Sequence, residues 1–466
     1  MNRQEHVTEI EQFRKEVYQN FNKRADTLMD LLDALCSQTR AGSVVELSLQ
    51  NCFRRSYSAI FKAIDEYRPG DDDLAHLAGP SLPEPQQRPF WLLGVDVTPQ
   101  PRPYARTLAE RGFVYQPTVI WGNKPITIGH QYSTVALLPE KDKEQPVTWV
   151  VPLSCQRVKL EDSKALVGAA QIGELLGDAK LPFREQLTVE VGDSDYSQPA
   201  YLAANREHEH LVSVVRCRGN RTFYRQKYRS ASETGGAPGH YGAPFNLKDP
   251  TAWHDPDDQT QLPFTTRRER QFQVTIQAWH NMLMRGKNKP ERIRMHQFPF
   301  TLVRIVLLDE DGQSRFKHPL WLLVIGPRRL ELNLEHIYQA YTQRSDLEHF
   351  FRFGKQKLLL ANYQTPDLKR EERWWHLAHL AYLQLWIAKD TAASLPRPWE
   401  RNLPQHKAGK ITPTLVQRNF DRLISQFGTP AKIPKPRGKP SGRRKGFRLA
   451  PRQRHKVLKK GENPPI

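Results

Sequence analysis

The segment PFWLLGVDVTPQPRP, residues 89–103, is the clearest structural signal in this chain of 466 residues. It is a short apolar run that is bounded by prolines and interrupted by one carboxylate, Asp96. Such a run is typical of a buried central strand. A lone strand aspartate is ordinarily a turn former or a paired surface charge. Because an unpaired charge inside a buried strand is costly, Asp96 is instead a candidate functional residue.

The residues that follow predict an α/β layer. Three strands come first, and then a helix, a strand, a helix and a strand alternate. Asp193 directly follows the fourth strand, so Asp96 and Asp193 lie at or near strand ends, where open α/β sheets place their chemistry. Asp195 competes with Asp193, which we prefer because it comes first after the strand. The strands are expected at residues 89–103, 126–138, 147–160, 187–196 and 211–219, and the helices at 163–177 and 197–209.

The flanking regions have different compositions. Residues 1–80 carry apolar residues at helical spacing and predict an N-terminal helical domain, which either binds DNA through arginines such as Arg40, Arg54 and Arg55 or simply has a basic surface. Prolines between 80 and 89 indicate a linker. Residues 218–332 contain strand-like runs between Gly/Pro-rich loops, which predicts a β-rich insertion. Residues 396–466 are a basic, partly disordered tail with no acid from Lys432 to Lys460.

Composition favours a polyanionic partner. The net charge of +20 and the pI near 9.8 point to nucleic acid ahead of a membrane surface. Four scattered cysteines form no C-x-x-C pair, which is typical of buried thiols in a reducing compartment. The sequence has no apolar run long enough to span a bilayer and no signal peptide. We expect a cytoplasmic protein that associates with the nucleoid.

The stretch YTQRSDLEHFFRFGK contains Tyr341, Arg344, Glu348 and Lys355 in the pattern Y-x2-R-x3-E-x6-K. On one helix the last three residues would lie roughly 60°, 20° and 40° from the first around the axis. The stripe suits a metal-ligating carboxylate between two cations that reach different phosphates. The ordinary alternative is a solvated face with an Arg–Glu pair at i,i+4.

Asp96, Asp193 and Glu348 thus form a candidate metal site. Three acids brought together are costly unless cations neutralise them, which Mg²⁺ or Mn²⁺ would do. Two such ions, about 3.5–4 Å apart, can activate a water or a 3′-hydroxyl and stabilise the leaving oxygen of a phosphoryl transfer.

These residues carry a resemblance over residues 90–390 to the DDE transposases of bacterial insertion sequences, in the subgroup with the Y-R-E-K signature. It implies an RNase H-like catalytic core, a mixed sheet flanked by helices, in residues 89–217 and 333–395. It further implies a triad of Asp96, Asp193 and Glu348 with two Mg²⁺ ions, and DNA contacts by Tyr341, Arg344 and Lys355. The implied partners are double-stranded DNA, as terminal inverted repeats and target DNA, and a second copy of the chain in a homodimer.

Members of that family nick DNA at the element ends and join the freed 3′-OH to target DNA, and some stack a flipped base on a tryptophan of the insertion. Trp253 and Trp279 are candidates for that role, but buried core positions are the simpler interpretation for both. His376 and His379 are expected in a core and not on a metal. The alternative functions are a stand-alone nuclease of the same fold, an inactive DNA-binding relative and an RNA-binding protein.

Overall fold

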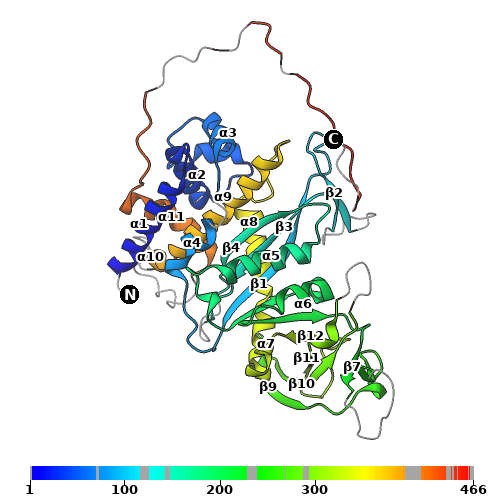
Figure 1. Ribbon diagram of the computed structural model, residues 1–466. Helices are drawn as coiled ribbons and strands as arrows, with labels where there is room; N and C mark the ends of the chain where they lie inside the picture. Colours follow the sequence, from blue (N-terminus) through cyan, green and yellow to red (C-terminus); the bar gives the residue numbers. More distant parts are fainter. Residues whose placement is uncertain are drawn as a thin grey trace. The chain divides into compact units, whose positions relative to one another are not determined.

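The computed structural model describes residues 3–69, 73–115, 125–141, 147–227, 239–266, 268–286, 293–393, 411–436, 442, 445–448, 450–459 and 461 (Figure 1). It is a mixed α/β protein with a large mixed sheet and helices, as the sequence predicts. The chain divides into two compact units. Unit 1 comprises Met1–Pro83, Val97–Ser163 and Asp346–Ile466, and unit 2 comprises Glu84–Asp96 and Lys164–Ser345.

Unit 2 is built on three parallel strands. The first part of β1 (Trp91–Pro101) pairs with β5 (Thr188–Gly192), and β5 pairs with β6 (Leu211–Cys217). All five residues of β5 are buried, so its sequence TVEVG carries a buried glutamate, Glu190, as well as its two valines. The sheet continues from β6 through antiparallel strands in the order β12 (Leu320–Ile325), β11 (Phe300–Leu308), β10 (Gln271–Leu283), β7 (Thr222–Gln226) and β8 (Tyr241–Asn246), with β9 (Asp258–Thr265) on β10.

Three helices accompany the strands of unit 2. Helix α5 (Lys164–Gly177) packs against α6 (Pro199–Asn205), and both lie where the sequence predicts helices. Helix α7 (Leu334–Gln343) packs against β5, β6, β9 and β10. Its first turn is capped by Asn333, whose Oδ1 accepts a hydrogen bond from the His336 amide at 2.7 Å.

Unit 1 contains most of the helices. The N-terminal helices are α1 (Arg3–Asn20), α2 (Ala25–Ser37), α3 (Tyr57–Glu66) and α4 (Asp73–Ala78). They are followed by the end of β1, then β2 (Gly112–Tyr115), β3 (Ile126–Leu137) and β4 (Val151–Val158). The later helices are α8 (Ser345–Lys357), α9 (Leu368–Ile387), α10 (Lys389–Ala393) and α11 (Pro413–Phe427).

Helix α9 forms the centre of unit 1. It packs against α1, α2, α11 and β4, which explains why its sequence is rich in aromatic residues on every side. The Trp375 ring stacks on Tyr132 of β3 at a centroid distance of 3.9 Å. His379 is fully buried and His376 donates or accepts a hydrogen bond with the Tyr67 hydroxyl at 2.7 Å. The core position predicted for His379 is therefore confirmed, whereas His376 is half-buried.

Two arginines that we considered for DNA contact are occupied inside unit 1. Arg54 Nη2 lies 2.6 Å from Asp30 Oδ1 and donates to the Ala431 carbonyl at 3.1 Å. Arg55 Nη2 donates to the Lys432 carbonyl at 2.9 Å. Both side chains thus tie the segment after α11 to the N-terminal helices, whereas Arg40 is exposed.

The structure differs from the sequence prediction in three places. The stretch from Tyr341 to Lys355 is two helices and not one, because the Arg344 amide bonds to the Tyr341 carbonyl and ends α7. Helix α11 lies within the region predicted as a tail, whereas residues 394–410 and much of the region after 436 lie outside the described residues. The strands β2, β7, β8 and β9 were not predicted from the sequence.

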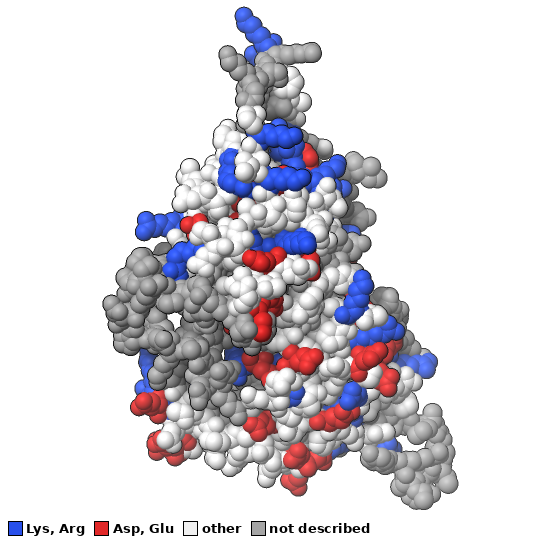
Figure 2. All heavy atoms as spheres, turned by 90° about the vertical axis from the view of Figure 1, so that its left-hand side faces the viewer, with Lys and Arg blue, Asp and Glu red and all other residues white. Residues whose placement is uncertain are grey.

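Of the helices that the structure describes, none combines the length and the hydrophobicity that crossing a membrane requires. Figure 2 shows one face of the molecule, on which Lys and Arg side chains gather toward the top of the view and mix with Asp and Glu elsewhere. On this face the basic character of the sequence is therefore unevenly distributed.

Candidate active site

Asp96 and Asp193 lie at the ends of neighbouring parallel strands in unit 2. In the pairing of β1 with β5, Trp91 is opposite Thr188 and Gly94 is opposite Val191. The same register, carried two residues further, brings Asp96 level with Asp193. Neighbouring strands are about 4.8 Å apart, so we expect the two carboxylates to lie near each other, and both act electrostatically on the same residue, Tyr196. The Asp96 side chain is 19% exposed.

The pKa of the Tyr196 phenol is affected by the negative charges of both carboxylates. Its ring is 1% exposed, and burial raises the pKa of its phenol well above the usual value, with the negative charges of Asp96 and Asp193 adding to the shift. Gly192 makes room for this ring, because a Cβ at position 192 would lie 2.9 Å from the ring carbons of Tyr196. The segment after β5 therefore turns back and packs its aromatic ring beneath the two acids.

Asp195, the competing candidate, already has two cationic partners. Its Oδ2 forms an ion pair with Lys164, and its Oδ1 lies 3.2 Å from Arg218 Nη2. Asp193 Oδ1 instead accepts the Asp195 amide at 2.8 Å, which caps the short helical turn Ser194–Ser197. This arrangement favours Asp193 over Asp195 as the functional carboxylate.

Tyr341 and Arg344 belong to the same unit as the two aspartates. Arg344 Nη1 lies 3.7 Å from Asp96 Oδ2, and the Arg344 side chain is 17% exposed. The Tyr341 side chain is 8% exposed, and burial raises the pKa of its phenol. Two residues of the Y-R-E-K pattern, Tyr341 and Arg344, thus lie in the same unit as Asp96, and the Arg344 guanidinium compensates part of the Asp96 charge.

Glu348 and Lys355 lie on α8 in unit 1. Glu348 is exposed in the first turn of the helix, where the helix dipole favours a negative charge. Lys355 Nζ donates to Thr98 Oγ1 at 2.7 Å and to the Pro99 carbonyl at 3.1 Å, so it contacts the second part of β1. Buried Asp346, which pairs with Lys141 at 2.7 Å, fixes the start of the helix.

The donor chemistry fits a hard divalent cation. Carboxylate oxygens are the ligands that Mg²⁺ prefers, whereas zinc sites use histidine and cysteine. Within the described ranges, no group of three or more His, Cys, Asp or Glu side chains is assembled as a metal-binding cluster. Unit 2 by itself therefore contributes two adjacent carboxylates to such a site, and Glu348 belongs to the other unit.

Some residues of this region were not found from the sequence. Glu190 of β5 is fully buried, and desolvation raises the pKa of its carboxyl to about 7. Its Oε1 accepts a hydrogen bond from Asn205 of α6 at 3.2 Å. Alternation along TVEVGD places Glu190 and Asp193 on opposite faces of β5, a signal that could have identified Glu190 as a buried acid. No pattern in the sequence indicated that Lys164 and Arg218 would pair with Asp195.

The two tryptophans of the insertion have different environments. Trp279 is 1% exposed, and its Nε1 donates to the His254 carbonyl at 2.7 Å. It packs with Phe245 and Trp321, which confirms a core position. Trp253 is half-buried, with the Arg304 guanidinium 5.0 Å from its ring centroid.

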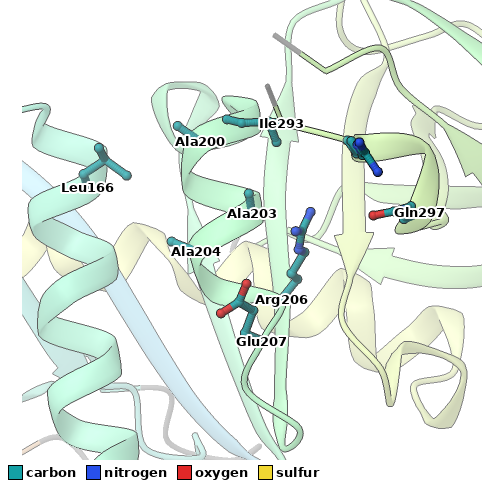
Figure 3. A pocket seen from close by; sticks show the side chains of 9 residues that line it. Leu166, Ala200, Ala203, Ala204, Arg206, Glu207, Ile293 and Gln297 are labelled. Carbon is teal, nitrogen blue, oxygen red and sulfur yellow. The ribbon is translucent and has the colours of Figure 1, made fainter. Parts of the chain in front are cut away.

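A separate pocket of about 530 Å³ lies in unit 2 beside α5 and α6 (Figure 3). Leu166 faces it from α5, and the alanines of α6 form its wall. The Arg206 guanidinium stacks over the Phe298 ring at 3.1 Å from the centroid, so the pocket's main cation is already engaged. None of the candidate catalytic residues lines this pocket.

Comparison with known proteins identifies the family. The model of the DDE superfamily endonucleases matches residues 16–286, which is 271 of the 466 residues. The match includes Asp96 and Asp193 and ends before the Y-R-E-K stretch, so it supports DNA cleavage without assigning a subgroup. No curated protein matches the chain. The paired aspartates thus lie within a recognised endonuclease domain, and the chain belongs to the DDE superfamily of endonucleases.

Proposed function

We propose that this endonuclease is a DNA transposase of the insertion-sequence type, in the Y-R-E-K subgroup, with an RNase H-like core. It would nick DNA at the ends of its element by hydrolysis and then join the freed 3′-OH to target DNA. The observation that supports this most strongly is the level placement of Asp96 and Asp193 on adjacent parallel strands inside the family match.

In this proposal Asp96, Asp193 and Glu348 hold two Mg²⁺ ions, for which Mn²⁺ can substitute. When bound, the ions would lower the pKa of the attacking water or hydroxyl and neutralise the charge that develops on the phosphate. Asp193 can offer the oxygen that does not cap the turn, since only Oδ1 accepts the Asp195 amide.

The cations of the stripe have separate roles. Arg344 compensates part of the Asp96 charge, as its 3.7 Å contact indicates, and would contact the scissile phosphate when DNA binds. Tyr341 supports Arg344, because its ring centroid lies 6.0 Å from the guanidinium carbon. Lys355 contacts the DNA backbone while its bonds to Thr98 and Pro99 hold its chain in place.

The proposed partners are double-stranded DNA, as terminal inverted repeats and as target, and a second copy of the chain. Two element ends must be processed together in cut-and-paste transposition, which a homodimer would accomplish. The net charge of +20 suits such a polyanionic substrate.

The test supplies the purified chain with Mg²⁺, a labelled pre-cut DNA end that bears a free 3′-OH, and a supercoiled target plasmid. Joining of the label to the plasmid supports the transposase. Hydrolysis without joining would identify a stand-alone nuclease. DNA binding without either reaction would identify an inactive relative, and both results would refute strand transfer. The Asp96→Asn variant is the control for contaminating nucleases.

A further inference from the structure

The C-terminal end of the described chain is docked onto unit 1. The His455 amide donates to the Arg106 carbonyl at 2.9 Å, and the Leu458 amide donates to the Arg111 carbonyl at 3.0 Å. The Leu458 side chain is 7% exposed. Residues 450–459 therefore run along the connection between β1 and β2, and Figure 1 shows this red segment beside β2.

The connection that receives this segment is internally braced. Arg111 is 2% exposed, and its Nη1 donates to the carbonyls of Arg102 and Pro103, both at 3.1 Å. A Cβ at Gly112 would collide with the Leu160 side chain and lie 3.6 Å from the Leu458 carbonyl oxygen. The glycine at position 112 thus makes room for the Leu160 side chain, whereas the Leu458 carbonyl lies at an ordinary contact distance.

The docked segment presents cations to solvent. Arg452, Arg454 and Lys456 are exposed, whereas Leu458 is buried as the anchor. The sequence from Lys432 to Lys459 contains no acidic residue that could neutralise them. A row of exposed positive charge in a segment that has no acid of its own, held by main-chain bonds, suits a polyanion.

The hairpin of β2 and β3, which directly follows the connection that holds the docked segment, leaves large apolar side chains exposed. Phe113 is 59% exposed and Tyr115 is 61% exposed, two residues apart and therefore on one face of β2. Ile126 of β3, directly opposite Tyr115, is 53% exposed. Contiguous exposed apolar side chains of this kind mark interaction sites.

We propose that Phe113, Tyr115 and Ile126, together with Arg452, Arg454 and Lys456, bind unpaired nucleotides of DNA. Exposed rings on β2 and exposed cations on the segment docked to the preceding connection match a flexible ligand with flat apolar faces and a charged backbone, which unpaired DNA offers and a duplex conceals. The proposal rests on DNA being the substrate. It involves none of the candidate catalytic residues.

The test measures binding of a fluorescein-labelled 20-nucleotide oligo(dT) to the full-length chain in EDTA, so that cleavage does not interfere. The F113A/Y115A variant should bind at least about tenfold more weakly, since each stacked base contributes a comparable factor. The R452Q/R454Q/K456Q variant should reduce the slope of log K against log salt by about 2, at roughly 0.7 for each lost phosphate contact.

Matched controls separate these effects from nonspecific ones. The Y57A variant removes a ring that is 60% exposed on α3, and K15Q/K62Q removes exposed cations of the same unit. Both controls should bind like wild type, and all variants should keep the wild-type melting temperature. Unchanged oligo(dT) affinity in F113A/Y115A would overturn the proposal, as would an equal loss in Y57A.

Binding of a second copy of the chain or of a membrane to the exposed face of β2 and β3 would give different results. If F113A/Y115A changes the oligomeric state or the binding to anionic vesicles while oligo(dT) affinity is intact, the face serves a second copy or a membrane and the proposal fails. Failure of the wild-type chain to bind any DNA would instead refute the proposed function itself. The two kinds of failure are therefore distinguishable.

Discussion

Replacement of Glu190 by glutamine should stabilise the protein at alkaline pH. Glu190 is fully buried in β5, and desolvation raises the pKa of its carboxyl from 4.5 to about 7. A carboxyl with a raised pKa binds more protons in the folded state than in the unfolded state between these two values. Its contribution to stability is therefore present below about pH 4.5 and is lost as the pH rises through 7.

The expected change in the free energy of unfolding follows from the shift in the pKa of Glu190. A difference of roughly 2.5 pKa units corresponds to about 3 kcal/mol between the two protonation states. Glutamine is uncharged at every pH and can still accept the hydrogen bond that Asn205 Nδ2 donates at 3.2 Å. We therefore expect Glu190→Gln to raise the free energy of unfolding at pH 8.5 by up to about 3 kcal/mol relative to wild type, and to have little effect at pH 4.5.

Urea unfolding at pH 4.5, 6 and 8.5 measures this difference. The matched control is Glu185→Gln, which removes an exposed carboxylate from the same segment and should leave the pH dependence unchanged. A Glu190→Gln variant that is equally destabilised at all three pH values would show that the carboxyl is held by its hydrogen bonds and not penalised by burial. That result would contradict a pKa of Glu190 that is raised by burial.

Three further predictions concern the site and the insertion. Asp96→Ala, Asp193→Ala and Glu348→Ala should each reduce plasmid nicking in Mg²⁺ by about 10³-fold or more while electrophoretic mobility shifts still detect DNA binding; retained nicking would remove that residue from the site. Asp195→Asn should keep nicking within about tenfold of wild type, because two cations already hold that carboxylate. Trp279→Ala should lower the free energy of unfolding by about 3–5 kcal/mol in urea denaturation, and a smaller loss would contradict its core position.

The parallel strands were predictable because burial on both faces leaves a nearly continuous apolar sequence. The first half of β1 and most of β6 show this pattern, whereas β5 carries Thr188 and Glu190 at buried positions. β9 was missed for the opposite reason, since DQTQLPFT is mostly exposed and its pairing with β10 supplies no apolar alternation. Main-chain hydrogen bonds to β10 hold β9 in place, and because every residue type except proline can form them, the sequence does not reveal them.

Helix α11 could have been predicted from its capping residues, but the many Lys and Arg residues around it suggested a disordered tail instead. Thr412 accepts a hydrogen bond from the Leu415 amide, Pro413 occupies the first turn, and Gly428 ends the helix at φ +72°. Its apolar side, which includes Val416 and Phe420, is buried in unit 1. The surrounding cations suggested a tail, although the capping residues were present in the sequence. By contrast, no spacing rule could show that Arg54 and Arg55 bond to carbonyls about 377 residues away.

Register decides which acids can act together. The sequence supplies Asp96 and Asp193 on separate strands, but only the pairing of Gly94 with Val191 brings them level. A slip of β1 by one residue would turn the Asp96 side chain to the opposite face of the sheet, away from Arg344. Trp91, Leu92 and Leu93 are buried on both faces of the strand, so the slip is opposed by their sizes, since it would put a leucine in a site packed around tryptophan or the reverse. The apolar residues of β1 thus determine the geometry of the carboxylate that follows them.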